Sequence, residues 1–296
     1  MLMKKIIFAL VALLTAAIGN AQTKTVARES KSLLWKISGK GLAKPSYLFG
    51  TMHILCAEDI KISENFRNVI NGSDLIYFEV DMDNMMEILG SLRYLKMSDN
   101  KKLSDLLSPA DYEKVKDYFT KNAGMIPFPM MESFKPFFLS SMMSDQSMDC
   151  PSKEGMETAI MKEAKISNKE IKGLETIQFQ ASVFDSIPYE RQAKELVKAI
   201  DSPASDVDHT KELVAVYKAQ DLDKIQSMTV QEDGVLSEYL DLLLYNRNAN
   251  WAGKMAQLMP ANSILFAVGA AHLPGDKGVI SLLKKSGYTV TPVANN

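Results

Sequence analysis

The sequence predicts an α/β fold with a mixed central sheet, flanking helices and a long helical insert. Short apolar runs bounded by glycine and turn residues alternate with helical patterns near both ends of the chain. Most of the sequence between about residues 84 and 259 has helical patterns instead. Polar or ionisable residues stand just after several of the apolar runs. An alternating order of strands and helices is typical of a sheet that is covered by helices.

The first part of the chain predicts a hairpin followed by a helix and a further strand. Residues 32–38, which are mostly apolar, and residues 47–49 are predicted strands, and the turn-rich residues 39–45 between them indicate a hairpin. Ser63 is a suitable cap for a helix that ends near residue 70, where Asn71 and Gly72 stop it. Residues 74–80 have the pattern of a buried strand.

The rest of the chain predicts the insert and then the end of the sheet. In the insert we expect a strand at residues 170–174 and helices at residues 84–97, 108–121, 134–143, 153–164, 176–184, 189–220 and 222–259, with breaks near residues 201–203 and 220–221. After the insert we expect a strand at 263–268, a helix at 277–285 and a last strand at 288–292.

Residues 1–21 have the three parts of a secretory signal peptide. Lys4 and Lys5 precede an apolar run of thirteen residues, and small residues follow up to Ala21. The run is shorter than the ~20 residues of a helix that crosses a bilayer. We therefore expect cleavage near Ala21, no stable membrane anchor, and a bacterial protein that is periplasmic or secreted, with one domain over residues 22–296.

The net charge bears on the kind of partner, and the two cysteines bear on whether the chain has a disulfide. The formal net charge is −2 and no basic stripe is evident, so nucleic acid is not expected as a partner. The two cysteines are Cys56 and Cys150. Export to an oxidising compartment favours a disulfide, but their spacing leaves two isolated thiols as the alternative.

Two of the three histidines occupy matched positions. Each follows an apolar strand, a glycine and two small or flexible residues, in Gly50-Thr51-Met52-His53 and Gly269-Ala270-Ala271-His272. Two neutral imidazoles with one carboxylate are a common ligand set for a divalent metal. A single turn histidine usually bonds to the backbone, but the matched pair favours a metal site.

Carboxylates stand at other strand ends. Glu79 lies at the C-terminal end of one predicted strand and Glu175 stands at the end of another, and the carboxyl ends of parallel strands converge at one edge of a sheet. A charged group at such a buried edge must be paired, metal-bound or facing a pocket. Glu79 is thus a candidate ligand or general base. Arg247 and Asn248 open a predicted helix, where spacing alone predicts a surface arginine.

Six segments, taken in order, resemble the TraB/GumN family, also described as Tiki-like. They are residues 34–37, 46–53, 78–81, 173–176, 247–248 and 268–273. Animal Tiki members are metal-dependent proteases that require the paired Gly-X-X-His segments and a glutamate. The resemblance implies that His53, His272 and Glu79 are metal ligands or catalytic residues, and that Glu175, Arg247 and Asn248 line the pocket. The wider fold group resembles erythromycin esterases (EreA) and haem-binding ChaN proteins.

Taken together, these features give one leading function and two alternatives. The leading function is an exported metal-dependent hydrolase, a peptidase that uses a divalent metal to activate water for attack on a peptide or small-molecule substrate. Manganese, cobalt and zinc are not distinguished by this ligand set, and Arg247 would steady the developing oxyanion. The alternatives are a non-catalytic haem or peptide binding protein of the same fold, and a pseudoenzyme.

Overall fold

The computed structural model describes residues 31–84, 86, 90–122, 126–146, 148, 150–231 and 235–295, without the side chains of residues 144–146, 203–206 and 235–236. These residues belong to one compact unit, Lys31–Asn296. The predicted signal peptide, residues 1–21, lies outside the described residues. Within the described ranges, no helix has the length and apolar character needed to cross a membrane.

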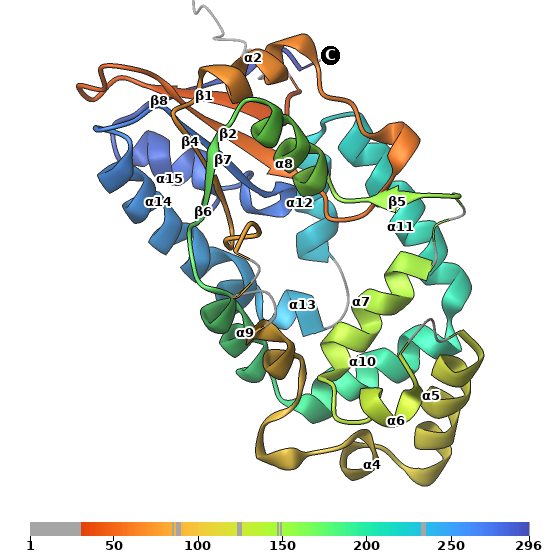
Figure 1. The fold of residues 1–296 in the computed structure, drawn as a ribbon. Helices are drawn as coiled ribbons and strands as arrows, with labels where there is room; N and C mark the ends of the chain where they lie inside the picture. The colour runs from red at the N-terminus through yellow and green to blue at the C-terminus, as the bar shows by residue number, and fades with distance from the viewer. Residues whose placement is uncertain are drawn as a thin grey trace, which may run out of the picture. The chain divides into compact units, whose positions relative to one another are not determined.

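A mixed six-stranded sheet forms the centre of the unit, as predicted (Figure 1). The strand order is β6-β4-β7-β2-β1-β8. The neighbours β2, β7, β4 and β6 pair in parallel, whereas β1 is antiparallel to both β2 and β8. The bounds are β1 Leu34–Ser38, β2 Ser46–Thr51, β4 Leu75–Phe78, β6 Glu170–Gly173, β7 Ile264–Gly269 and β8 Thr289–Val293.

The N-terminal hairpin and the helix after it form as the sequence predicts. In the hairpin Leu34 lies opposite Phe49. The Ser63 hydroxyl accepts a hydrogen bond from the Phe66 N–H and caps α2 (Glu64–Gly72). Phe66 is fully buried, and its ring stacks on Phe49 at 3.9 Å between centroids. This contact fixes α2 against the sheet. After α2 the chain continues into β4.

Helices cover both faces of the sheet (Figure 1). The crossovers from β2 to β4 and from β4 to β6 run in one direction, through α2 and α8 (Met156–Ile166), and the return to β7 runs the other way, through α14 (Asn246–Leu258). Right-handed connections therefore place α14 on the face opposite α2 and α8. The five residues 264–268 of β7 are at most 1% exposed. Burying such a side chain contributes about 1.5–3 kcal/mol, so β7 is a main source of stability.

The insert is mainly helical and has a core of its own. Figure 1 shows α4 to α7 and α10 gathered away from the sheet. Their buried residues include Phe119, Met131 and Leu139, each 0% exposed. The helices are α4 Leu103–Leu106, α5 Pro109–Asn122, α6 Phe128–Met131, α7 Pro136–Gln146, α9 Ile177–Asp185, α10 Tyr189–Asp201, α11 Pro203–Lys218, α12 Leu222–Gln231 and α13 Val235–Glu238, with a short π-helix η4 at Asp241–Tyr245. After β7 come the 3₁₀-helix η5 (Ala270–His272) and α15 (Val279–Lys285).

Two of the predicted helices begin or end differently in the structure. Lys153–Glu154 is not helical but forms β5, which pairs with β3 (Leu55–Cys56) in a separate two-stranded sheet. The helix predicted at residues 84–97 lies partly outside the described residues. In its described part Leu92–Leu95 is a 3₁₀-helix, η2, and Lys96 instead forms a β-bridge with Phe134. Pairing with a distant segment overrides the local pattern at both places.

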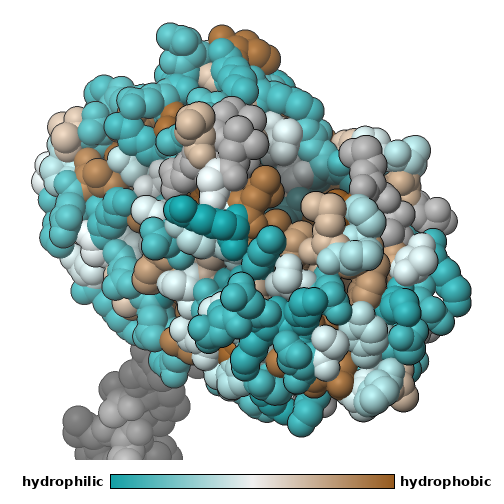
Figure 2. Space-filling view, turned by 60° about the horizontal axis from the view of Figure 1, so that its bottom comes forward, coloured by the Kyte–Doolittle hydropathy of each residue, from teal (hydrophilic) through white to brown (hydrophobic). Residues whose placement is uncertain are grey.

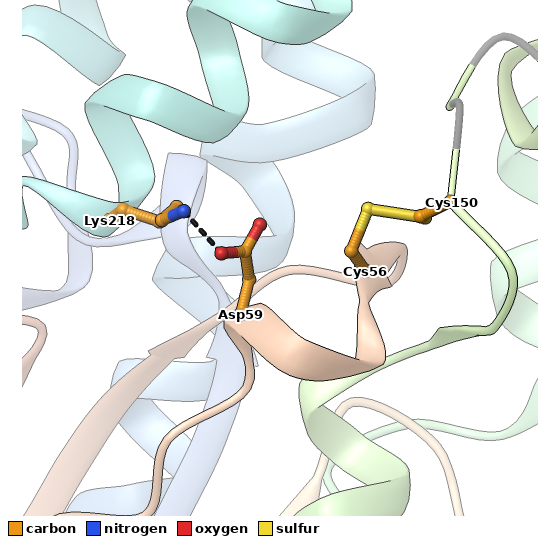
Figure 3. Close-up of a disulfide and its surroundings, with 4 residues drawn as sticks. All are labelled: Cys56, Asp59, Cys150 and Lys218. Atoms are coloured by element: carbon orange, nitrogen blue, oxygen red, sulfur yellow. Dashed lines mark hydrogen bonds and ion pairs between the residues drawn. A yellow bond between two sulfur atoms is a disulfide. The ribbon is translucent and has the colours of Figure 1, made fainter.

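The two cysteines form a disulfide (Figure 3). Cys56 ends β3, and Cys150 lies just before β5, so the bond joins the same two segments as the β3–β5 pairing. Asp59, in the 3₁₀-helix η1 (Ala57–Asp59), forms an ion pair with Lys218 on α11. The segment after β2 is therefore held on two sides.

Candidate functional site

The ends of four parallel strands meet at one edge of the sheet, and the predicted polar residues stand there. Thr51 ends β2, Glu79 follows β4, Glu175 follows β6 and His272 follows β7. The ladder between β4 and β6 continues past the strands, because the Glu175 N–H donates to the Glu79 carbonyl at 2.8 Å. The two glutamates therefore lie side by side at this edge.

Arg247 on α14 joins the two glutamates. It is 6% exposed, so the surface position that spacing alone predicts is wrong. Its Nη2 lies 2.7 Å from Glu79 Oε2 and 2.6 Å from Glu175 Oε1, and its Nη1 donates to the Leu243 carbonyl at 2.8 Å. The guanidinium also lies over the Trp251 ring, 4.6 Å from its centroid. Because its donors face internal acceptors, Arg247 positions the two carboxylates rather than presenting itself to a substrate oxyanion.

Glu79 is an ionised carboxylate with one lone-pair direction toward His272. Its Oε2 accepts from Arg247 and from Gln180 Nε2 at 2.9 Å, and its Oε1 accepts from the Gly269 N–H at 2.8 Å. Burial raises the pKa of Glu79, but His272, which is protonated at the low pH where Glu79 titrates, and the charges of Arg247 and His53 outweigh it and hold the pKa at about 2. Such a weak base fits a metal ligand better than a general base.

The pKa of Glu175 is shifted in the opposite direction to that of Glu79. Burial raises the pKa of its carboxyl, and the negative charge of Glu79 adds to this effect, against the contacts with Arg247. Its Oε2 also accepts from the Trp251 indole N–H at 3.0 Å. Glu175 is therefore fixed by two donors on α14 and orients that helix against the sheet edge.

His272 is a buried, neutral imidazole whose tautomer is fixed by Asn248. The Asn248 Nδ2 donates to the Lys277 carbonyl at 3.0 Å, which turns its Oδ1 toward His272 Nδ1 at 2.6 Å. Since Oδ1 can only accept, Nδ1 carries the proton and Nε2 carries a lone pair. Burial lowers the pKa of His272 to about 4. In this tautomer Nε2 accepts from Arg247 Nη1 at 3.4 Å and lies 3.7 Å from Glu79 Oε1.

Gly269 lies against both Glu79 and His272. A Cβ at this position would lie 3.2 Å from Glu79 Oε1 and 3.5 Å from His272 Cδ2. A side chain here would crowd the carboxylate and leave the imidazole in ordinary contact. The glycine of the second Gly-X-X-His segment therefore serves packing within the site.

His53 lies in a second cluster, with Glu157 at the start of α8. The His53 side chain is 71% exposed and its Nδ1 lies 2.8 Å from Glu157 Oε1, whose side chain is 7% exposed. This contact is an ion pair whose alignment falls short of a hydrogen bond. The Glu157 carboxylate is the main cause that raises the pKa of His53 to about 9. Gly155 permits the contact, because a Cβ there would lie 2.6 Å from the His53 carbonyl oxygen.

The two clusters act on each other electrostatically but do not form one ligand set. The charge of Glu79 raises the pKa of His53, and the charge of His53 lowers the pKa of both Glu79 and His272. No group of three His, Cys, Asp or Glu side chains in the described ranges is arranged to hold a metal ion. Of the predicted ligands, the structure therefore brings Glu79 and His272 together and pairs His53 with Glu157.

The chemistry of these donors nevertheless fits a divalent cation. Beside His53, the buried Glu157 Oε1 is paired with His53 Nδ1 at 2.8 Å without a well-aligned hydrogen bond, and the buried Thr51 Oγ1 has no hydrogen-bond partner among the described residues. A buried oxygen with neither an ion pair nor a hydrogen bond is costly unless something binds it. Together with imidazole nitrogens and the Glu79 carboxylate, these oxygens are ligands that manganese, cobalt and zinc accept.

Glu157 is the residue that sequence reasoning missed. It lies in the segment predicted as an amphipathic helix, where a glutamate is normally on the solvated face. The only local signal is Gly155, two residues before it, which resembles the glycines that precede His53 and His272.

The comparison with family models matches the TraB/PrgY/gumN family over residues 33–292. The chain belongs to the TraB/PrgY/gumN family. The match spans the insert and all of the sheet except the last residue of β8, Val293, so every residue of the candidate site lies within the part shared with the TraB/PrgY/gumN family. The resemblance to this family that the sequence motifs indicate is thereby confirmed.

Among curated proteins, this TraB/PrgY/gumN chain is similar to proteins named as Tiki metalloproteases. It is 22% identical to metalloprotease TIKI1 of Danio rerio over 92% of the chain and 65% of that protein. The metalloprotease TIKI homolog of Amphimedon queenslandica is 23% identical over 94% of the chain and 64% of that protein. Metalloprotease TIKI1 of Homo sapiens is 22% identical over 92% and 64%. The chain thus spans somewhat less than two thirds of these relatives. No solved structure matches it.

Proposed function

We propose that this chain is a metal-dependent hydrolase that cleaves peptides. The observation that carries the proposal is the buried pair of His272 and Glu79, with an unprotonated Nε2 facing a carboxylate oxygen at 3.7 Å. The names of the curated relatives support a protease, at about 22% identity. When bound, a divalent metal supplies Lewis acidity, which activates water and polarises the carbonyl under attack.

The proposed ligands are His272 and Glu79, which lie together in the structure, and His53, which would have to move toward them when the metal binds, with Glu157 as a further candidate. Asn248 keeps His272 in the tautomer that offers Nε2, as the second partner of a metal-bound histidine commonly does. Arg247 and Gln180 hold Glu79 in place through its Oε2, which leaves Oε1 toward His272. His53 must lose the proton that Glu157 stabilises before it can act as a ligand, so metal binding would release a proton.

The charges of the site favour a cation. Glu79 and Glu175 are each within 2.7 Å of the single cation Arg247, and the adjacent His272 is neutral. The buried cluster therefore holds two carboxyl groups and one guanidinium. When His53 is deprotonated, the Glu157 carboxylate loses its cationic partner and adds a further negative charge next to the cluster.

The experiment is a metal and cleavage assay on purified variants. The protein is loaded with manganese, cobalt or zinc, its metal content is measured by mass spectrometry, and cleavage of a mixed fluorogenic peptide library is followed. His53→Ala and His272→Ala should lose metal and at least ~100-fold in activity. The matched control is His209→Ala, which changes the remaining histidine of the chain, on α11. Wild-type metal content and activity in both site variants would refute the proposal.

A further inference from the structure

The segment that carries His53, residues 52–57, lies antiparallel to residues 150–157. The β3–β5 ladder joins the two segments in the middle. At one end, next to His53, the Met156 N–H donates to the Met52 carbonyl at 3.0 Å. At the other end the disulfide joins the segments covalently (Figure 3). His53 and the disulfide therefore belong to one short two-stranded unit, and the contacts that hold this unit together also hold His53.

The non-covalent part of this unit is small. Its ladder has two residue pairs, Leu55 with Glu154 and Cys56 with Lys153. A two-stranded unit of this kind is marginally stable in water without further support. The disulfide bridges a sequence separation of 94 residues, so in the reduced chain the same pairing has to close a long loop at an entropic cost. The bond is therefore a main support for the position of residues 52–57.

His53 lies on the open side of this unit. Its side chain is exposed and lines a cleft of about 800 Å³. Figure 2 shows a hollow in the molecular surface with hydrophobic residues on its walls. Because the imidazole projects toward open space, its position depends on the backbone of its own segment and on the contact with Glu157. Loosening the unit would therefore displace His53 while leaving His272 and Glu79, which are buried after β7 and β4, in place.

A pocket of about 460 Å³ gives access to the disulfide from the side of α11. Cys56 lies in its wall and is partly exposed. The charged residues of the wall are Lys211, Lys218 and Asp59, so the pocket carries a net positive charge. Thiol–disulfide exchange begins when a thiolate attacks a disulfide sulfur. A positive pocket raises the local concentration of anions, so this pocket favours a small anionic thiol.

We propose that the Cys56–Cys150 disulfide is a redox switch of the candidate metal site, with the oxidised chain as the metal-binding form. To open the bond, a thiolate attacks Cys56 Sγ and forms a mixed disulfide there, and Cys150 leaves as a thiolate that takes up a proton. A second thiol displaces Cys56 in the same way, so two small thiols become one disulfide and the chain gains two thiols. Residues 52–57 are then held less firmly, and His53 is lost as a ligand. This inference rests on the proposed function and adds a means of regulation to it.

The first experiment compares metal binding by the oxidised protein and by the double variant Cys56→Ser with Cys150→Ser, which has neither the bond nor a thiol that binds metal. Calorimetric titration with Mn²⁺, Co²⁺ and Zn²⁺ in turn gives the Kd. The double variant should bind at least ~10-fold more weakly, as when the support of a metal ligand is removed. Leu103→Ala is the matched control and should keep the wild-type Kd, because it lowers stability from the separate core of the insert. If the double variant does not fold, wild-type protein that is reduced and alkylated while folded replaces it.

The second experiment follows reduction of the folded protein by glutathione, a small anionic thiol, and by cysteamine, a cationic one. Alkylation and mass spectrometry count the freed thiols, and each rate is divided by the rate of the same thiol with a small reference disulfide. Glutathione should reduce the bond without denaturant and at the higher relative rate, and Lys211→Glu should narrow the difference. Equal relative rates in the wild-type protein would overturn the assignment of the pocket as the entry point for the thiol.

The outcomes separate the switch from the hydrolase. An unchanged Kd in the double variant, or a bond that opens only when the protein unfolds, overturns the switch and leaves the hydrolase standing. A Kd as weak in Leu103→Ala as in the double variant also overturns the switch, because general destabilisation then explains the loss. If the oxidised protein binds none of the three metals, the proposed metal-dependent hydrolase fails and the switch fails with it.

Discussion

Asn248 and His272 are joined by a hydrogen bond of 2.6 Å whose direction is set from outside the pair. The Asn248 amide N–H₂ is committed to the Lys277 carbonyl, so its oxygen must accept from His272 Nδ1. Asn248 thus controls which nitrogen of a buried imidazole is available for chemistry.

Replacing Asn248 by Asp should change the protonation of His272. A carboxylate at this position would stabilise the imidazolium and raise the pKa of His272 from about 4. We expect NMR titration of the imidazole to give a higher pKa in Asn248→Asp than in the wild-type protein. Asn248→Ala is the comparison that removes the bond without adding a charge. An equal pKa in Asn248→Asp and wild type would contradict the assigned contact.

The stability of the protein should fall on mild acidification because of His272. Its folded-state pKa is lowered to about 4 from the usual 6.5, so below pH 6.5 the unfolded chain binds a proton that the folded chain does not. The full contribution is present above pH 6.5 and is lost as the pH falls to 4, by roughly 3 kcal/mol. Urea unfolding at several pH values measures this loss. In His272→Gln the unfolding free energy should change less between pH 6.5 and 4 than in the wild-type protein. An equal change in both would contradict the lowered pKa of His272.

Removing Arg247 should destabilise the fold strongly. Arg247→Met leaves Glu79 and Glu175 buried without a cation, which costs about 3–5 kcal/mol. Urea unfolding gives the free energy. The double variant Arg247→Met with Glu175→Gln should recover part of the loss, since it removes one of the unpaired charges. A single variant within ~0.5 kcal/mol of wild type would show that the pairing contributes little.

Glu157 should control the pKa of His53. In Glu157→Gln the main cause of the raised pKa is gone, so the pKa of His53 should fall from about 9 toward 6.5. NMR titration of the ring protons measures it directly. Glu154→Gln is the matched control, because Glu154 is in the same segment but pairs with Lys162. If both variants leave the pKa near 9, Glu157 is not the partner of His53.

The Cys56–Cys150 disulfide should stabilise the fold by about 2–5 kcal/mol. The double variant Cys56→Ser with Cys150→Ser and the chemically reduced wild type should unfold at similar, lower urea concentrations. Amide exchange should also rise in the two paired segments, β3 and β5. Unfolding at the same urea concentration with and without the bond would contradict this expectation.

The sheet could be predicted from the sequence because its strands carry their own signals. Residues 264–268 are uniformly apolar and bounded by Ser263 and Gly269, and β7 forms there. β5 could not be predicted, since Lys153 and Glu154 have no strand pattern and become a strand only by pairing with β3, nearly a hundred residues earlier. The order of strands along the sheet likewise depends on contacts that no local pattern encodes.

The candidate site could be predicted in part for the same reason. His53, Glu79, Glu175 and His272 follow strands, so their common edge follows from the α/β order. Glu157 could not be found, because its burial depends on a contact with His53 from a helix about a hundred residues later in the chain. The separation of His53 from His272 into two clusters was also not predictable, since matched motifs say nothing about side-chain direction.

The position of β7 has a consequence for how the chain folds. β7 lies between β2 and β4, and β8 completes the edge beside β1, although both are made last. The earlier strands β2 and β4 have no neighbouring contact with each other until β7 enters the gap. During synthesis the first 263 of the 296 residues therefore cannot close the sheet, and folding must wait for the C-terminal residues. A chain that stops before Ile264 should consequently lack a cooperative unfolding transition, even though it retains most of its helices' sequence.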